Sequence, residues 1–291
     1  MKSLEIKVFP YLMLLPTLVI FTVFLFWPAI NGVWISLHAW DGLNAMRFLG
    51  IENYAGLFGD DQFVRAFGKT MLFTAITVPV VYVAALLLAL MLTGKIKGAG
   101  FFRAVFYWPT MISSIIVGLS WRFLLGESFG LVNFFLTSSG LPPVRWLTDS
   151  NMAMFTTVFV TAWSLAGYYM VMLIAGLKSI PDTYYEAAEI HGANSRQKFF
   201  YITLPLLRPM SLLVLVLSTV TVVRSYPLIL ALTGGGPAGA TRFMVQMIQQ
   251  TGFERMQMGY ASAMAVILFA VLAILTAVQF RMNRGGEQDA V

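Results

Sequence analysis

Long apolar stretches alternate with short polar ones along the 291 residues of the chain. Six apolar stretches are long enough to predict membrane-spanning helices, because about 20 apolar residues cross a bilayer. These predicted spans cover about 9–37, 70–94, 104–125, 151–177, 209–232 and 256–280. The polar stretches between them are short. The pattern therefore predicts an all-α, polytopic membrane protein that forms a single domain over residues 1–291.

Composition supports a membrane protein and narrows its chemistry. The chain is 58% hydrophobic and 11% charged, with a mean hydropathy of +0.78, whereas soluble domains carry about 25% charged residues. Cysteine is absent, which excludes a disulfide framework, a thiolate nucleophile and a cysteine-based metal site.

The net charge of +6 could suggest nucleic acid, but its distribution follows the membrane instead. The side that holds both predicted termini and the polar stretches 95–103 and 178–208 carries 11 Lys and Arg residues, against 6 on the other side. Lys and Arg accumulate on the cytoplasmic side of membrane proteins. We therefore expect both termini and the stretch 178–208 to be cytoplasmic, and we expect no nucleic-acid partner.

The polar stretch 178–208 reads as a helix, a turn and a second helix. Pro181 suits a helix start, and Gly192 suits the left-handed residue that follows a helix end. Asn194 or Ser195 can cap the second helix, which Leu204-Pro205 is expected to stop.

The first of these two helices has features of a docking surface. Ala187 and Ala188 are small, so another protein surface can approach closely. Glu186 and Glu189 lie three residues apart and share a helix face, where they can meet basic groups. A solvated connector between two spans is the alternative explanation.

The spacing of this stretch resembles the EAA loop of ABC-importer permeases, in which a short coupling helix docks on a cytoplasmic ATPase subunit. One position departs from the family pattern, because His191 stands where the family usually has Asp before the glycine. The matching residues are Glu186, Ala187, Ala188, Gly192, Ala193, Phe199, Ile202, Leu204 and Pro205.

Polar and aromatic residues inside two predicted spans are candidates for a solute pathway. Sugars bind to aromatic faces and to hydroxyl and amide groups, and the charge of Arg224 near mid-bilayer needs water or a polar partner. Ordinary helix packing explains such small polar residues equally well. The candidates are Trp163, Ser164, Tyr168, Thr221, Arg224, Ser225 and Tyr226.

The sequence contains no recognisable catalytic set. The two histidines, His38 and His191, do not form a pair with metal-ligand spacing. The glycine-rich segment 233–237 lacks the Lys of a nucleotide-binding loop. We therefore expect a non-enzymatic chain without its own cofactor.

The resemblance extends along the chain to the maltose, multiple-sugar and glycerol-phosphate group of these permeases, with their MetI-like transmembrane domain. It includes Asn53-Tyr54, the third span around Pro109 and Trp121, and the segment 233–237. It implies four partners: a second homologous permease subunit, an ATPase subunit dimer that binds ATP and Mg²⁺, an extracytoplasmic solute-binding protein, and membrane lipid.

The resemblance also implies ATP-driven import by alternating access across the bacterial cytoplasmic (inner) membrane, with a sugar or oligosaccharide as the solute. Glycerol phosphate or another polar solute is the alternative within this class. A secondary transporter is a less favoured alternative, because its ion coupling needs ionisable groups and the predicted spans contain no Asp or Glu.

Overall fold

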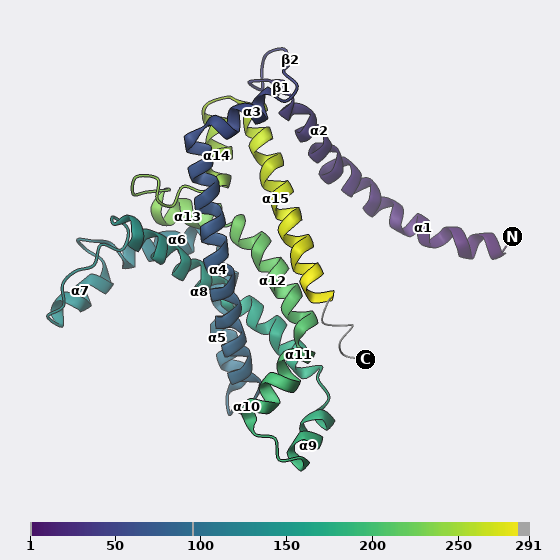
Figure 1. Cartoon of the computed structure of the whole chain (residues 1–291), viewed down its shortest axis with the longest axis vertical. Helices are drawn as coiled ribbons and strands as arrows, with labels where there is room; N and C mark the ends of the chain where they lie inside the picture. Colours follow the sequence, from purple (N-terminus) through teal and green to yellow (C-terminus); the bar gives the residue numbers. More distant parts are fainter. Residues whose placement is uncertain (1, 95, 285–291) are drawn as a thin grey trace. The chain divides into compact units, whose positions relative to one another are not determined.

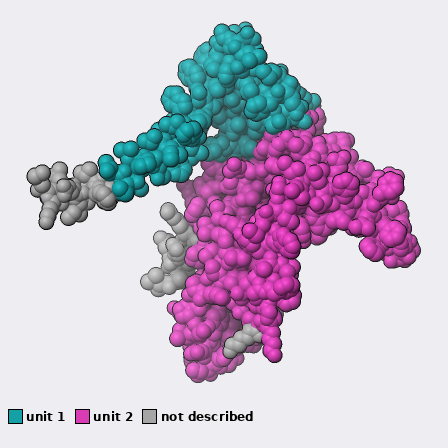
Figure 2. Space-filling model, turned by 180° about the vertical axis from the view of Figure 1, so that it is seen from behind, with its two compact units in different colours: residues 1–64, 247–270 teal, residues 65–246, 271–291 magenta. Residues whose placement is uncertain are grey.

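The computed structural model describes residues 2–94 and 96–284, and nearly all of this part of the chain is helical (Figure 1). A two-residue strand pair is the small departure from the predicted all-α class. Contacts divide the chain into two compact units (Figure 2). Unit 1 holds residues 1–64 and 247–270, and unit 2 holds residues 65–246 and 271–291.

Unit 1 consists of a long helical run, a small hairpin, a short helix and the beginning of the last helix. Its elements are α1 (Lys2–Phe21), the π-helical turn η1 (Thr22–Phe26), α2 (Trp27–Ser36), β1 (His38–Ala39), β2 (Arg47–Phe48), α3 (Glu52–Gly59), the π-helical turn η3 (Gln250–Glu254) and the first part of α15 (Met258–Arg284). β1 and β2 pair antiparallel, with His38 opposite Phe48.

Buried polar groups hold the hairpin of unit 1 in place. The side-chain amide of Asn53 donates to the carbonyls of Ser36 (2.8 Å) and His38 (3.0 Å). The hydroxyl groups of Ser36 and Tyr54 lie 2.6 Å apart. The Asn53-Tyr54 pair thus attaches α3 to the end of α2, which gives a structural reason for these residue types.

Unit 2 contains the remaining helices. They are α4 (Asp61–Thr93, from residue 65), α5 (Ala99–Met111), α6 (Ser114–Leu124), α7 (Leu131–Ser138), α8 (Ser150–Lys178), α9 (Asp182–Ile190), α10 (Ser195–Lys198), the π-helical turn η2 (Phe199–Thr203), α11 (Leu204–Leu206), α12 (Arg208–Val223), α13 (Tyr226–Thr233) and α14 (Met244–Gln249, to residue 246).

Helix α8 is the centre of unit 2 and contacts α5, α6, α12 and α13. It begins at Asp149, whose side chain accepts hydrogen bonds from the backbone N–H groups of Asn151 (3.0 Å) and Met152 (2.9 Å). Buried apolar side chains of α4, α8 and α12 form one core cluster, which includes Tyr169 and Leu207. This cluster anchors the polar stretch that follows α8.

Glycines allow the helices of unit 2 to approach closely. Gly167 of α8 lies against the backbone carbonyl of Phe106 in α5, and a Cβ atom at this position would overlap that oxygen. Gly118 of α6 lies similarly against the Leu228 carbonyl of α13. Small residues are typical of such contacts between membrane helices.

Four helices are long and apolar enough to cross a membrane within the described residues, or up to six if each bent pair forms one span. The four are Leu12–Ser36, Asp61–Thr93, Ser150–Lys178 and Met258–Met282. The bent pairs are Ala99–Met111 with Ser114–Leu124, at 99°, and Ser195–Leu206 with Arg208–Val223, at 65°.

Two predicted spans differ from the straight helices expected. The stretch 104–125 breaks where Ile112 and Ser113 adopt extended conformations between α5 and α6. The stretch 209–232 breaks at Arg224 and Ser225, between α12 and α13. The second break has a clear cause, because Pro227 lacks the N–H that a continuous helix would need and instead occupies the first turn of α13.

The contact at Gly167 gives a stability prediction. Gly167→Ala should destabilise the protein by about 1–3 kcal/mol, because the new methyl group forces α5 away from α8. Thermal unfolding of the purified protein in detergent measures the change. Gly68→Ala in α4 is the matched control, since no atom lies within 4 Å of its Cβ position and it should unfold at the same or a higher temperature. Equal unfolding temperatures for Gly167→Ala and the unsubstituted protein would contradict the close-packing argument.

Candidate functional site

The polar stretch 178–208 folds as two helical segments around a tight turn. Helix α9 follows Pro181 and ends at His191, whose N–H donates to the Ala187 carbonyl (3.2 Å). Gly192 follows with a φ of +77°, the left-handed conformation predicted for it. The sequence therefore anticipates the turn, although Pro181 is the residue before the first helical position rather than within the helix.

Asn194 caps the second helical segment. Its side chain accepts a hydrogen bond from the Gln197 N–H (2.9 Å), and the Gln197 side chain accepts one from the Asn194 N–H (2.8 Å). This reciprocal capping box satisfies two backbone donors at the helix start. It fixes the conformation of the turn between α9 and α10.

An ion pair closes the same turn. The Lys198 Nζ atom lies 2.7 Å from Oε1 of Glu189, joining α10 to α9. The hydrogen bond from Lys198, and then its charge, holds the pKa of Glu189 below the usual value. The Lys198 side chain is 21% exposed and that of Glu189 is 63% exposed, so the pair lies at the surface of the loop. Glu186 is also exposed, one turn earlier on α9.

Side chains also attach the stretch to the helix core. The hydroxyl groups of Tyr185 in α9 and Thr203 in η2 lie 3.0 Å apart. Tyr185 and Phe199 both pack against the core cluster that contains Leu207. Movement of α9 is therefore linked by direct contacts to the beginning of α12.

The predicted stop at Leu204-Pro205 is wrong, because the helical run continues through Leu206. The π-helical turn η2 shifts the hydrogen-bond register, so that the Leu204 N–H donates to the Phe199 carbonyl. Pro205 lies directly after this turn, in α11. The chain bends by 65° at Leu207 instead.

The pathway candidates of α8 fall into an exposed and a buried group. Trp163 and Tyr168 are 41% and 39% exposed, and Trp163 contacts Trp121 edge to face at 5.4 Å between ring centroids. Ser164 is buried, and its hydroxyl donates to the Thr161 carbonyl (2.9 Å). The Ser164 hydroxyl thus has the role expected from helix packing.

The candidates around the break between α12 and α13 lie near one another in the chain and are at least partly exposed. Thr221 and Arg224 are exposed, and Ser225 and Tyr226 are half-buried. Thr221 Oγ1 accepts a hydrogen bond from the Tyr169 hydroxyl (3.1 Å) of α8. The Ser225 hydroxyl donates to the Thr221 carbonyl (2.9 Å).

Tyr226 lines a small cavity beside this break. The cavity holds about 10 Å³, close to the space of one water molecule. The side-chain oxygen of Gln246 also lines it, is buried and has no hydrogen-bond partner within the described structure. The helix break, which the sequence interpretation missed, places Arg224 at a helix end. Pro227 was the available signal.

Among the side chains that the structure describes (residues 12–94 and 96–282), no three His, Asp or Glu gather in a geometry that could hold a metal ion. The site geometry therefore consists of a polar helix–turn–helix loop and, on other helices of unit 2, a group of aromatic, hydroxyl and guanidinium side chains.

Known proteins match this chain over nearly its whole length. Residues 48–285 match the family model described as binding-protein-dependent transport system inner membrane component. The sn-glycerol-3-phosphate transport system permease protein UgpA of Agrobacterium fabrum is 33% identical over 94% of both chains. The trehalose/maltose transport system permease protein MalF of Thermococcus litoralis is 33% identical over 94% of this chain and 93% of that protein.

A solved structure agrees with the sequence relatives. The bacterial alginate ABC transporter in complex with an alginate pentasaccharide-bound periplasmic protein contains a chain that superposes with a TM-score of 0.84. The two chains are 26% identical, and the superposition covers 97% of this chain and 96% of the other. This chain belongs to the family of binding-protein-dependent transport system inner membrane components, the permease subunits of ABC importers.

Proposed function

We propose that this chain is the permease subunit of an ATP-driven importer for a sugar or oligosaccharide. The family match and the relatives that transport trehalose, maltose and alginate support this solute class. The exposed aromatic rings of Trp163 and Tyr168 suit the C–H faces of sugars. Thr221 is exposed on the same unit, although its hydroxyl already donates to the Leu217 carbonyl (2.8 Å).

Six spans with both termini in the cytoplasm form the proposed topology, in the bacterial inner membrane. Besides the four long helices, we assign one crossing to the bent pair α5–α6 and one to α12 with α13 over 209–232. The excess of Lys and Arg on one side supports the orientation. The stretch 178–208 then lies in the cytoplasm, where an ATPase subunit is accessible.

The loop geometry carries the proposal of ATPase coupling. Glu186, Ala187 and the partly buried Ala188 lie on α9, which the capping box, the Glu189–Lys198 ion pair and the Tyr185–Thr203 contact hold against the core. Such a preorganised helix can transmit the motion of a docked subunit without bending.

Four partners complete the proposed importer. A second permease subunit completes the pathway, and an ATPase subunit dimer binds ATP and Mg²⁺ and hydrolyses ATP. A solute-binding protein delivers the solute outside, as the periplasmic protein bound to the alginate transporter suggests. Lipid surrounds the spans. This chain has no catalytic role in the proposal.

Alternating access is the proposed mechanism. Closure of the ATPase dimer moves α9, and the contacts of Tyr185 and Phe199 carry that movement to α11 and α12. A full switch between inward-open and outward-open populations requires about 5.5 kcal/mol of differential binding. The solute then passes the break at Arg224 and Ser225, near Tyr226.

Glycerol phosphate is the second candidate solute, because Arg224 is exposed at a helix break and could bind a phosphate group. The similarity to a glycerol-3-phosphate permease favours the same alternative.

Reversing the charge of Glu186 tests the docking surface. Glu186→Lys should reduce ATP-dependent uptake at least about tenfold, because it places a repulsive charge where a basic group of the ATPase should bind. Co-purification of the ATPase should fall in parallel, while the unfolding temperature stays unchanged. Asp182→Lys makes the same charge change one turn earlier on α9 and should retain most uptake. Full uptake by Glu186→Lys would refute the docking surface.

Exchanging the charges of the Glu189–Lys198 pair tests whether the closed turn matters for coupling. Lys198→Glu should lower uptake per ATP hydrolysed, and adding Glu189→Lys should restore it, because the swapped pair re-forms the 2.7 Å contact. Arg196→Glu is the control for a charge change on the same helix. Failure of the double variant to recover coupling would show that the pair does not position α9.

The same pair gives a pH prediction. Because the pKa of Glu189 is lowered, its stabilising contribution is present above the usual Glu pKa of about 4.3 and disappears only as the pH falls through the lower folded-state value. Uptake by the unsubstituted and the charge-swapped importer should therefore have the same pH profile between pH 6 and 8. The prediction would be contradicted if coupling changed with pH between pH 6 and 8 in the unsubstituted importer and the charge swap removed that change.

The identity of the solute is tested at Arg224. If the solute is anionic, Arg224→Ala should abolish the inhibition of uptake by glycerol phosphate. If the solute is a neutral sugar, the substitution should change its half-saturating concentration for uptake by no more than about threefold. Trp163→Ala should instead weaken the stimulation of ATPase activity by sugar and leave the inhibition by glycerol phosphate unchanged. Arg122→Ala, at the last turn of α6, is the control. Unchanged uptake and ATPase stimulation in both variants would place the pathway elsewhere.

A further inference from the structure

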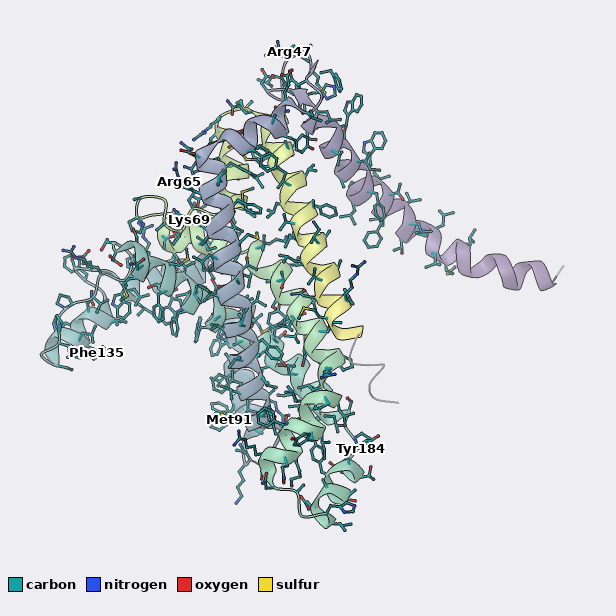
Figure 3. The ribbon with its side chains drawn as sticks, in the orientation of Figure 1. Arg47, Arg65, Lys69, Met91, Phe135 and Tyr184 are labelled. Atoms are coloured by element: carbon teal, nitrogen blue, oxygen red, sulfur yellow. The ribbon has the colours of Figure 1, made fainter. Side chains whose placement is uncertain are left out.

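Helix α7 lies in an arm of unit 2 that the proposed function does not use. The arm comprises residues 126–149, between α6 and α8. Figures 1 and 2 show it projecting from the other helices of its unit, and Figure 3 shows Phe135 near its end. An exposed arm of this kind needs both an internal structure and a surface to lie against.

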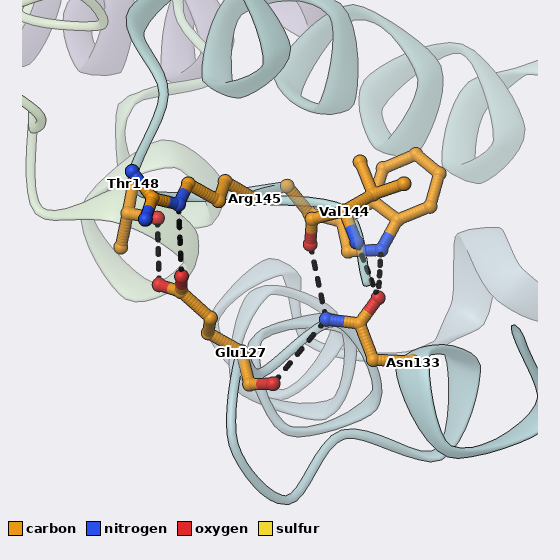
Figure 4. Close-up of polar contacts among 6 residues, drawn as sticks. Glu127, Asn133, Val144, Arg145 and Thr148 are labelled. Carbon is orange, nitrogen blue, oxygen red and sulfur yellow. Dashed lines mark hydrogen bonds and ion pairs between the residues drawn. The ribbon is translucent and has the colours of Figure 1, made fainter. Parts of the chain in front are cut away.

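The internal structure is a compact polar network (Figure 4). The buried amide of Asn133 donates to the carbonyls of Val144 (3.0 Å) and Glu127 (3.3 Å), and its oxygen accepts from the Val144 N–H (3.0 Å) and the Trp146 indole N–H (3.1 Å). The Glu127 carboxylate pairs with Arg145 (3.2 Å) and accepts from the Thr148 hydroxyl (2.8 Å). The loop is therefore preformed rather than dependent on a partner.

The opposite side of α7 is apolar and exposed. Phe134 and Phe135 are 63% and 66% exposed, and Phe129 just before the helix is 98% exposed. No charged residue occurs between residues 128 and 144. The hydroxyls of Thr137 and Ser138 donate to carbonyls within α7 itself. The arm thus has a charged face, at Glu127 and Arg145, and an apolar face with few side-chain groups that can hydrogen-bond to water.

The residue types on the apolar face favour lipid over another helix. Where helices of this chain pack on one another, as at Gly118 and Gly167, a glycine permits close approach. The exposed apolar positions of α7 are instead Leu131, Phe134 and Phe135. Large apolar side chains suit insertion into the membrane interface, whereas helix contacts favour small residues. The charged groups beside them, Glu127 and Arg145, lie in the segments before and after α7.

The position of the arm in the chain also favours contact with lipid. Helix α8 directly follows the arm and has 29 residues, which is long enough to cross the bilayer. The stretch 178–208 at its other end is cytoplasmic, a step that rests on the proposed function. The arm therefore lies at the outer side of the membrane. Phe123, near the end of α6, is also exposed.

We propose that α7 is an interfacial helix that inserts Leu131, Phe134 and Phe135 into the outer leaflet of the membrane, while the Glu127–Arg145 pair faces the headgroups and water. The arm thereby fixes the depth of the α5–α6 bend. The ligand is phospholipid acyl chain, and the site is separate from both the coupling loop and the pathway candidates.

The absence of cysteine from the chain allows a direct test with single-cysteine variants. Phe135→Cys, and Leu131→Cys as a second site on the same face, are labelled with an environment-sensitive fluorophore in the full importer, reconstituted in phosphatidylcholine–phosphatidylglycerol nanodiscs. Ser139→Cys, at the exposed end of α7, is the matched control. Quenching is measured with 5-doxyl phosphatidylcholine in the nanodisc and with iodide in solution.

Doxyl lipid should quench the labels at 131 and 135 at least about twofold more than the label at 139, and iodide should show the reverse order. Stronger iodide quenching at 131 and 135 than at 139 would overturn the proposal by placing this face in water. Shielding of both sites from both quenchers would overturn it in favour of a protein partner. Solute uptake by the same samples reports separately on the proposed function, so failure of one does not imply failure of the other.

Discussion

The need to satisfy every backbone N–H and C=O inside hydrocarbon governs this fold. It makes nearly all of the described chain helical and turns side-chain hydroxyls back onto their own helices, as at Thr70 and Thr74. Breaks are therefore confined to a few places. Two of them, at Ile112–Ser113 and at Arg224–Ser225, precede α6 and α13, which pack against each other at Gly118. The contacts between α6 and α13 therefore stabilise both breaks.

This arrangement separates rigid parts from exposed polar ones. The break before α13 places Arg224 at a helix end, beside Ser225 and Tyr226, while α8 presents Trp163 and Tyr168. The helix–turn–helix loop is held by its own capping box and ion pair. Its attachment to the core through Tyr185 gives a direct mechanical route from the loop to α12. The proposed import mechanism uses both features.

Hydropathy and fixed motif offsets were sufficient to predict a helical membrane permease, the turn at Gly192 and a cap at Asn194 or Ser195, because these depend on local sequence. The break at 112–113 is supported by the packing of α6 on α13, which hydrophobic periodicity does not reveal. For the break at 224–225, Pro227 was a local signal that the interpretation overlooked. Proline alone does not mark a helix end reliably in this chain. Pro227 lies in the first turn of a new helix after a break, whereas Pro205 lies after a π-helical turn in a helical run that continues. The partner of Glu189 was missed because Lys198 lies on the following helix.

The central claim is that α9 couples this permease to an ATPase subunit. Disulfide cross-linking in the assembled importer tests it most directly, with Ala187→Cys in this cysteine-free chain and single cysteines placed along the ATPase surface groove. The account predicts an efficient cross-link from position 187 whose yield changes between the ATP-bound and nucleotide-free states. An importer that remains active in uptake but forms no cross-link from position 187 in either state would contradict it.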